Sequence, residues 1–392
     1  MESTLVTDVS DPSKVEYTEW INPGMVSWIY WAYNHGSKDY QKVKEYIDLA
    51  AEMHWPYNLI DWEWDEMSNG GNLQDAVKYT LNKGIKPLLW YNSSTNWIGP
   101  GPLFRLNKKQ DREKEYAWLS EMGIAGIKVD FFSGDSVSTM NYYIDLLEDA
   151  IKYKLMLNFH GATIPRGWQR TYPHMMSIEG VYGAEWYNNA PILTNRAAEH
   201  NATLPFTRNV VGPMDYTPGI FEPDCSKMNP NNKSHARTTL ARQLALYVTM
   251  YSPLQMAADV PENYERFMDA FQFIKDVAVD WDETKYLEAE PGEYITIARR
   301  AKNTNDWYVG CTAGYNGHVS KLSFDLLDPD KKYEAIIYAD AKDASWDKNP
   351  QAYTITKKKV TSKSKMTLKA GIGGGYAISC LLYTSPSPRD YA

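Results

Sequence analysis

The sequence of 392 residues has little cysteine, no excess of basic residues and no long apolar run. Its three cysteines, Cys225, Cys311 and Cys380, are odd in number and far apart, which argues against a disulfide framework or a cysteine-based zinc site. Lysine and arginine number 41 against 49 aspartates and glutamates, so the net charge of −8 argues against a nucleic-acid partner. No stretch reaches the roughly 18 apolar residues of a membrane helix, and the first residues lack the basic and apolar regions of a signal peptide.

Aromatic residues are plentiful, but phenylalanine is scarce among them. The chain has 14 tryptophans and 29 tyrosines against 10 phenylalanines, so most of its rings carry a hydrogen-bonding group. Such rings suit wet, concave binding sites, including sites for sugars.

From about residue 23 to residue 280 the chain alternates short apolar runs with polar segments of helical periodicity. This alternation predicts parallel strands joined by crossover helices, and eight strands favour a (β/α)₈ (TIM) barrel. Gly84 and Gly123 follow two of the helices as stop signals. The expected strands are 28–32, 57–62, 86–91, 126–132, 155–160, 175–179, 204–209 and 253–257, and the expected helices are 39–53, 73–83, 109–122, 136–152 and 234–249.

After residue 282 the helical pattern gives way to short alternating segments between turn residues. This pattern predicts a small C-terminal antiparallel β-sandwich with strands near 294–300, 307–312, 321–324, 333–338, 353–355, 365–368 and 375–379. We therefore expect a catalytic barrel at 23–284 and a sandwich at 285–380. The stretch 381–392 has a Ser/Pro composition without a core-forming pattern, and we interpret it as a non-native tail.

Several expected barrel strands end in acidic, basic or imidazole side chains. In such barrels the carboxyl ends of the strands form the active face, so these side chains are expected to converge on one ligand. They are Asp61 and Glu63 after the second strand, Lys128 and Asp130 on the fourth, Asn158 and His160 on the fifth, and Glu179 and Glu185 after the sixth.

Paired carboxylates beside aromatic rings suit glycoside hydrolysis. One carboxylic acid protonates the leaving oxygen, while another carboxylate attacks the anomeric carbon or activates water. Strand alternation places Lys128 and Asp130 on one face, where the ammonium group is expected to hold Asp130 ionised.

Four motifs in order resemble glycoside hydrolase family 97, bacterial α-glycosidases with a calcium ion in the site. They are GIKVDFF at 126–132, LNFHGA at 157–162, SIEGVYGAEW at 177–186 and TRNVVGPMDYTPG at 207–219. The resemblance covers roughly residues 15–380.

This resemblance sorts the sequence between two mechanistic branches. The inverting branch, which includes α-glucosidases, has a base glutamate directly after the histidine of the fifth strand, where this chain has Gly161. In the retaining branch, which includes α-galactosidases, the aspartate of the fourth strand is the nucleophile, and Asp130 occupies that place. The resemblance further implies Glu185 as general acid/base, Glu179 and Glu185 as calcium ligands, and His160 as a contact to sugar hydroxyls. Weaker expected substrate contacts are Lys128, Asp61, Glu63, Asn158 and Arg208.

The resemblance also bears on what surrounds the barrel. Family members carry a large N-terminal β-sandwich that supplies another calcium-binding glutamate, so residues 1–22 are interpreted as a linker remnant of that missing domain. A periplasmic or secreted location is implied by the resemblance alone, and the oligomeric state is not predicted.

The sequence thus predicts a retaining exo-α-glycosidase, an α-galactosidase acting on oligosaccharides or small α-galactosides, with Ca²⁺ as cofactor. The sequence does not distinguish a preference for galactose from one for β-L-arabinopyranose, because the ring hydroxyls of the two sugars have the same arrangement. Two alternatives remain: an inverting α-glucosidase, which Gly161 disfavours, and a catalytically silent sugar-binding fragment. A barrel aldolase or metal-dependent deacetylase is more distant, because paired histidines at ligand spacing and a Schiff-base lysine context are missing from the sequence.

Overall fold

The computed structural model describes residues 8–29, 36–99, 101–189 and 191–383. By their contacts these residues form two compact units, which are described separately below. Of the described residues, the first contains those within 8–193, 206–235 and 250–266, and the second contains those within 194–205, 236–249 and 267–383. Among the described residues, no helix is long and apolar enough to cross a membrane.

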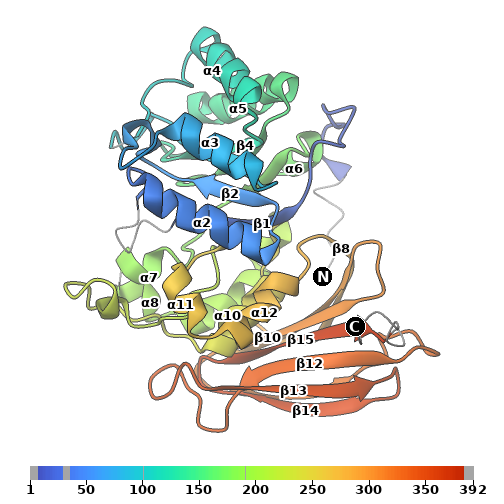
Figure 1. Cartoon of the computed structure of the whole chain (residues 1–392). Coiled ribbons are helices and arrows are strands. Elements are labelled where there is room, and N and C mark those ends of the chain that lie inside the picture. The colour runs from blue at the N-terminus through green and yellow to red at the C-terminus, as the bar shows by residue number, and fades with distance from the viewer. Residues whose placement is uncertain (1–7, 30–35, 100, 190, 384–392) are drawn as a thin grey trace, which may run out of the picture. The chain divides into compact units, whose positions relative to one another are not determined.

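The first unit is built on a parallel sheet of seven strands (Figure 1). Its order is β6-β5-β4-β3-β2-β1-β7, so neighbours in sequence pair side by side, and β7 closes back onto β1. This arrangement is that of the predicted barrel, with seven strands among the described residues instead of the expected eight. The strand residues are buried except Lys86, the first residue of β3. The strands are β1 (Gly24–Trp28), β2 (Tyr57–Ile60), β3 (Lys86–Asn92), β4 (Gly126–Asp130), β5 (Met156–Phe159), β6 (Met175–Ile178) and β7 (Leu254–Ala257).

Helices follow the first strands, and local capping explains where they begin and end. Asp39 accepts hydrogen bonds from the first-turn amides of α2, and Asn72 and Asp75 form a capping box at the start of α3. Gly123 ends α4 in the left-handed conformation, as predicted. The helices of this unit are α2 (Tyr40–Met53), α3 (Leu73–Asn82), α4 (Lys109–Met122), α5 (Val137–Tyr153), α6 (Trp168–Thr171), α7 (Trp186–Asn189) and α11 (Pro261–Glu265), while α8 (Pro191–Thr194) extends from it to the first residue of the second unit.

Two expected barrel strands are placed differently. The segment 204–209 was predicted as a strand, which is wrong: the 3₁₀ helices Leu204–Phe206 and Arg208–Val211 lie there. The first strand lies at Gly24–Trp28 instead of 28–32, of which residues 30–32 fall outside the described residues. Position 24 of this strand needs glycine, because a Cβ there would lie 2.3 Å from a side-chain carbon of Pro56.

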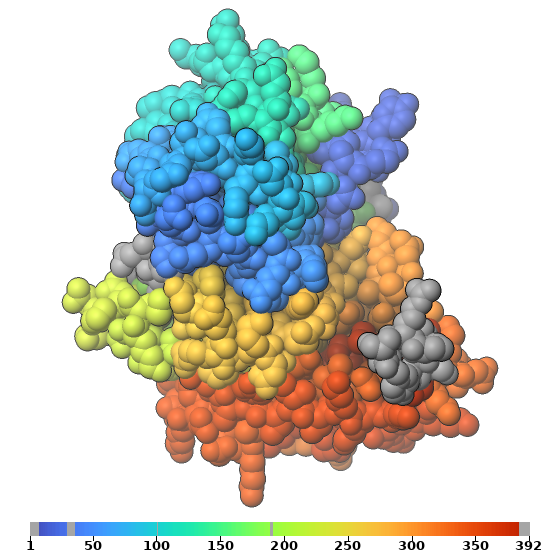
Figure 2. Space-filling view, in the orientation of Figure 1, coloured from blue at the N-terminus to red at the C-terminus, as the bar shows by residue number. Residues whose placement is uncertain are grey.

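The second unit holds the predicted antiparallel sandwich. A six-stranded sheet of order β13-β12-β15-β10-β9-β8 shares an apolar core with the two-stranded sheet β11-β14. The strands are β8 (Trp281–Glu290), β9 (Tyr294–Ala301), β10 (Trp307–Ala313), β11 (His318–Ser323), β12 (Tyr333–Asp340), β13 (Tyr353–Val360), β14 (Lys365–Ala370) and β15 (Gly375–Leu382). In Figure 2 the later of these strands, orange to red, form a continuous surface on the face shown.

Three helices also belong to the second unit: α9 (Ala197–Thr203), α10 (Leu240–Thr249) and α12 (Met268–Asp276). Helix α10 packs on β10 and β15, and every residue of α10 is buried. The expected tail at 381–392 begins inside β15, which runs to Leu382, and residues 384–392 lie outside the described residues.

Candidate active site

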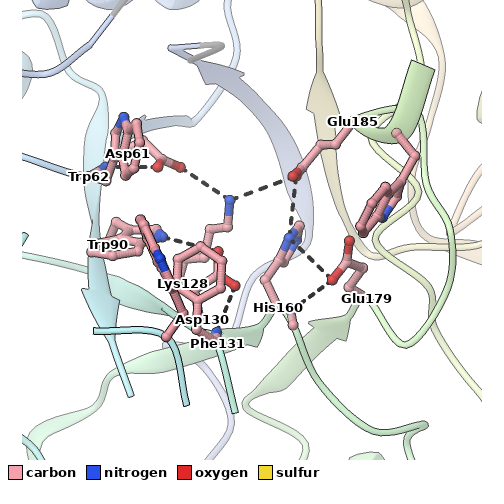
Figure 3. Close-up of a pocket in the computed structure, with 12 residues that line it drawn as sticks. Asp61, Trp62, Trp90, Lys128, Asp130, Phe131, His160, Glu179 and Glu185 are labelled. Atoms are coloured by element: carbon pink, nitrogen blue, oxygen red, sulfur yellow. Dashed lines mark hydrogen bonds and ion pairs between the residues drawn. The ribbon is translucent and has the colours of Figure 1, made fainter. Parts of the chain in front are cut away.

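A pocket of about 470 Å³ opens at the carboxyl ends of the barrel strands (Figure 3). Acidic, basic and aromatic side chains alternate around it. The residues that line it are Asp61, Trp62, Trp90, Trp97, Lys128, Asp130, Phe131, His160, Gly161, Glu179, Glu185 and Trp186. The structure therefore brings together most of the predicted site residues from strands β2, β4, β5 and β6.

Asp130 is the last residue of β4, and its carboxylate is held from two sides. The backbone N–H of Phe131 donates to Oδ1 at 2.8 Å, and the indole of Trp90 on β3 donates to Oδ2 at 3.2 Å. Burial raises the pKa of Asp130, and Lys128 and His160 oppose this rise without cancelling it. Lys128 thus acts in the predicted direction, but desolvation has the larger effect. The two hydrogen bonds favour the ionised form that a nucleophile requires.

Lys128 lies at the bottom of the pocket, with carboxylates around it. Its ammonium nitrogen is 3.2 Å from Asp61 Oδ2 and 3.9 Å from Glu185 Oε1, and it sits 4.8 Å from the ring centroid of Trp28. Burial lowers the pKa of Lys128, but the carboxylates outweigh burial and the net shift is upward. Lys128 is therefore a fixed positive charge in the site.

Asp61 anchors this lysine and is fully satisfied itself. It accepts hydrogen bonds from the Trp28 indole at 2.7 Å and from the Trp62 backbone N–H at 2.7 Å, and it is only 2% exposed. If its carboxylate turned away from the pocket, Lys128 would lose its shorter ion pair and keep only the longer one to Glu185.

His160 follows β5 and bridges three carboxylates. Its Nε2 lies 2.7 Å from Asp215 Oδ2, while Nδ1 lies 3.3 Å from Glu185 Oε1 and 3.9 Å from Glu179 Oε2. Burial and Lys128 lower the pKa of His160, whereas Glu179 and Asp215 raise it. The carboxylates outweigh burial, so the net shift is well upward.

Glu179 follows β6 and accepts a hydrogen bond from the Gly161 N–H at 2.7 Å. Burial raises the pKa of Glu179 to about 7; His160 lowers it, while Glu185 and Asp130 add to the rise. The carboxylates in this part of the pocket repel one another, which is the electrostatic situation that a bound cation relieves.

One group of side chains here has the spacing of a metal site. His160, Glu179 and Glu185 each offer one ligand atom, and these atoms all lie within 4.8 Å of one another. Calcium prefers oxygen, so the two carboxylates fit that ion, whereas the imidazole nitrogen does not. Because calcium takes about 6–8 ligands, these two glutamates form part of a shell that other oxygens must complete.

Three expected substrate contacts do not line this pocket. Glu63 pairs with Lys38 at 3.1 Å. Asn158 lies in the barrel interior, where its amide donates to Asp215 at 2.6 Å. The guanidinium of Arg208 donates to the backbone carbonyls of Ile178, Glu179, Gly180, Gly212 and Pro213, which fixes the segment carrying Glu179.

Trp90 and Asp215 hold key groups of the site. From the sequence, Trp90 is expected mainly in the core, and Asp215, in a loop after the seventh expected strand, is expected only to help shape the pocket. For Trp90 a signal existed, because the parallel register pairs it with Lys128 on β4. Asp215 lies in an irregular segment, where no periodic pattern reports which way a side chain points.

Gly161 makes space for Asp130. A Cβ at this position would lie 2.8 Å from the Phe131 nitrogen and 3.0 Å from Asp130 Oδ1. Its φ of +50° also favours glycine. A larger residue directly after His160 therefore competes with the observed position of Asp130.

Comparison with protein families matches both parts of the chain. Residues 20–181 match the family model described as "Glycoside hydrolase 97", and residues 280–380 match "Glycosyl-hydrolase 97 C-terminal, oligomerisation". Together these matches cover well over half of the sequence.

Two curated relatives are similar to this chain. A probable retaining alpha-galactosidase of Streptomyces bingchenggensis is 32% identical over 83% of this chain and 49% of its own length. A retaining alpha-galactosidase of Bacteroides thetaiotaomicron is 32% identical over 94% of this chain and 55% of its own length. The chain thus spans about half the length of these relatives.

Solved structures agree with these matches. A glycoside hydrolase family 97 enzyme from Pseudoalteromonas sp. strain K8, solved in complex with panose, is 30% identical with a TM-score of 0.87 and covers 98% of this chain and 64% of its own. A beta-arabinopyranosidase is 32% identical with a TM-score of 0.84 over 96% of this chain and 59% of its own.

Proposed function

Because the chain belongs to glycoside hydrolase family 97, we propose that its barrel carries the site of a retaining exo-α-glycosidase, specifically an α-galactosidase. The observation that carries this proposal is the Asp130 carboxylate at the end of β4, directed into the pocket by Phe131 and Trp90. The names of the two curated relatives support the galactoside preference.

Hydrolysis proceeds in two displacements. In the first, Asp130 forms a bond to the anomeric carbon, the glycosidic C–O bond breaks, and Glu185 gives its proton to the leaving oxygen. In the second, Glu185 takes a proton from water, the water oxygen bonds to the anomeric carbon, and Asp130 is released. Retention predicts that the two carboxyl groups lie about 5–5.5 Å apart.

The remaining polar side chains bind and orient the sugar. Asp61 and Lys128 present a carboxylate and an ammonium group to its hydroxyls, and His160 is a further contact. Trp62 and Trp97 offer ring faces, 6.1 Å apart between centroids, for the sugar's C–H surface.

A calcium ion is part of this proposal. Glu179 and Glu185 are the described side chains that would hold it, and the ion would supply positive charge to orient sugar hydroxyls. Burial raises the pKa of Glu179, and repulsion from Glu185 and Asp130 adds to the rise; a cation at this place would relieve that repulsion.

The substrate class and setting follow the same family. Oligosaccharides or small α-galactosides are the proposed substrates. β-L-Arabinopyranosides share the ring arrangement of galactosides, and one solved neighbour is named a beta-arabinopyranosidase. We propose a periplasmic or secreted location for the protein. We also propose that the catalytic barrel spans 23–284 and the sandwich 285–380. The description of the matched C-terminal family supports self-assembly through that sandwich.

The test compares aryl α-galactoside and aryl α-glucoside hydrolysis, with calcium and with a chelator. Galactoside cleavage that stops on chelation is expected. Asp130→Ala should lose turnover by at least about 10³-fold, and azide should restore it with the inverted β-galactosyl azide as product. Asp135→Ala, an aspartate with a 75% exposed side chain, is the matched control and should behave like wild type.

Other outcomes would replace the proposal. Cleavage of glucoside alone with inversion would assign the inverting α-glucosidase. Galactose binding without hydrolysis would assign a silent sugar-binding fragment.

A further inference from the structure

His160 lies between a buried carboxylate that does not line the pocket and the proposed acid/base. Its Nε2 is 2.7 Å from Asp215 Oδ2, and its Nδ1 is 3.3 Å from Glu185 Oε1. Asp215 is 1% exposed and His160 is 1% exposed, so water does not compete for this contact. Asp215, His160 and Glu185 therefore form one line of side chains that leads into the pocket.

The chemistry of this line fixes the orientation of the ring. A carboxylate only accepts hydrogen bonds, so the imidazole nitrogen that faces Asp215 carries a proton. With Nε2–H held by Asp215, the other nitrogen must point to the opposite side, where Glu185 lies. Contact with Asp215 on one side thus sets the direction from which the ring meets the Glu185 carboxyl on the other.

Asp215 is itself held rigidly. Asn158 donates to the same Oδ2 at 2.6 Å, and the backbone N–H of Asp215 donates to Ile178 O at 3.1 Å, next to the segment that carries Glu179. This explains why Asn158 is polar although it lies away from the pocket lining. Asp215 does not line the pocket, whereas its partner His160 does.

We propose that Asp215 is a positioning residue of the glycosidase reaction: it holds Nε2 of His160 and so fixes the orientation of the ring, which in turn aligns the Glu185 carboxyl with the glycosidic oxygen. This inference rests on the proposed function. It predicts that loss of Asp215 weakens acid assistance to the leaving group and leaves the attack by Asp130 intact.

The test is a leaving-group comparison with Asp215→Asn. A nitrophenyl leaving group departs with little protonation, whereas a methyl or sugar leaving group needs the acid. In the full chain, Asp215→Asn should lower kcat/KM for methyl α-galactoside by about 10²-fold and for nitrophenyl α-galactoside by less than about 10-fold. An equal loss on both substrates would mean a purely structural role and would overturn the proposal, as would no loss.

Two further variants separate positioning from packing. Asp259→Asn replaces another fully buried aspartate, one that accepts hydrogen bonds from Phe221, Glu222, Val260 and Asn263 and not from pocket residues. Any loss that it causes should be equal for both substrates. In a double-mutant cycle, Asp215→Asn should have little further effect on the ratio of the two substrates once His160→Ala is present. Additive effects on that ratio would contradict action through His160.

Ring ¹⁵N NMR gives a readout without turnover. The chain has 7 histidines, and His160→Ala identifies the signals of His160. A protonated Nε2 is expected in the wild type, with an altered signal in Asp215→Asn, and an unprotonated Nε2 or an unchanged signal would overturn the proposal. If the wild type cleaves no α-galactoside, the proposed function fails, while this measurement still decides whether Asp215 orients His160.

Discussion

At the residue scale, Gly161 leaves the space into which the strand end carrying Asp130 fits. Gly161→Ala would place a Cβ 3.0 Å from Asp130 Oδ1 and 2.8 Å from the Phe131 nitrogen, in a backbone with positive φ. We expect a loss of stability of about 1 kcal/mol from the backbone conformation and a fall in kcat/KM because Asp130 is displaced.

The control for this prediction is Gly134→Ala in the loop after β4. Gly134 has a φ of +61°, and nothing lies within 4 Å of its added Cβ. Gly134→Ala should lose a similar amount of stability, measured by thermal unfolding. It should keep the wild-type kcat/KM. If Gly161→Ala keeps full activity as well, Gly161 does not determine the position of Asp130.

Lys128 is the second residue whose replacement tests the electrostatics of the site. Its ammonium group lies beside Asp61 and Glu185 and lowers the pKa of Asp130. Lys128→Met leaves buried carboxylates uncompensated, which then take up protons, so kcat/KM should fall by about 10²-fold or more. Lys78→Met, an exposed lysine on α3, is the control and should match the wild type in aryl-galactoside assays.

At the element scale, the loop between β3 and α4 carries an exposed aromatic wall of the pocket. Trp97 lines the pocket, is 44% exposed and packs against Phe131 with ring centroids 4.6 Å apart. Its exposed face suits the ring of an aglycone. Trp97→Ala should raise KM for aryl or disaccharide α-galactosides several-fold while leaving kcat nearly unchanged, because the attack by Asp130 does not involve it.

Phe104→Ala provides the comparison on the same loop. Phe104 is 58% exposed and does not line the pocket, so its removal should not change KM. Equal effects of both variants would indicate a general disturbance of the loop rather than a contact to the aglycone.

The elements themselves were predictable where periodicity and caps coincide. The expected helix 109–122 is α4 to the residue, because Gly123 ends it sharply. The segment 204–209 was misassigned because its apolar residues resemble a short strand, whereas Pro205 lacks an amide hydrogen for a sheet and sits in a 3₁₀ turn. The start of β1 was missed because Gly24 and Ser27 do not give the apolar pattern of a strand. These small residues fit there because of buried contacts with Pro56 and Tyr46, which the local sequence does not show.

The site was also predictable only in part, namely where its residues lie at strand ends. Charged residues at strand ends such as Asp130 and His160 follow from barrel geometry, because the register of parallel strands brings them together. Partners from irregular segments, such as Asp215, depend on tertiary packing that no local pattern encodes.

At the scale of the whole molecule, acid should destabilise the first unit through a histidine far from any proposed catalytic role. His174 precedes β6, is fully buried and has its Nε2 2.9 Å from Leu147 O. Burial lowers the pKa of His174 from 6.5 to about 4, although the hydrogen bond to Leu147 acts in the opposite direction. The folded chain therefore keeps this ring neutral at pH values where the unfolded chain protonates it.

The sign follows from which state binds more protons. Between the folded and unfolded pKa values the unfolded chain holds more protons, so the free energy of unfolding falls as the pH falls through this window. The loss from about pH 7 to about pH 5 amounts to about 2 kcal/mol from this one group. Urea unfolding followed by tryptophan fluorescence measures it, since Trp20 lies against the His174 ring at 5.7 Å.

His174→Gln removes the titrating ring and retains an amide that donates to Leu147 O. This variant should be less stable than the wild type at neutral pH, because the ring packing is lost, yet its stability should depend less on pH by about 2 kcal/mol over the same window. His54→Asn changes an exposed histidine at the end of α2 and should leave the wild-type pH dependence in place. A wild-type slope that persists in His174→Gln would place the acid sensitivity in other groups, the buried carboxylates of the pocket first among them.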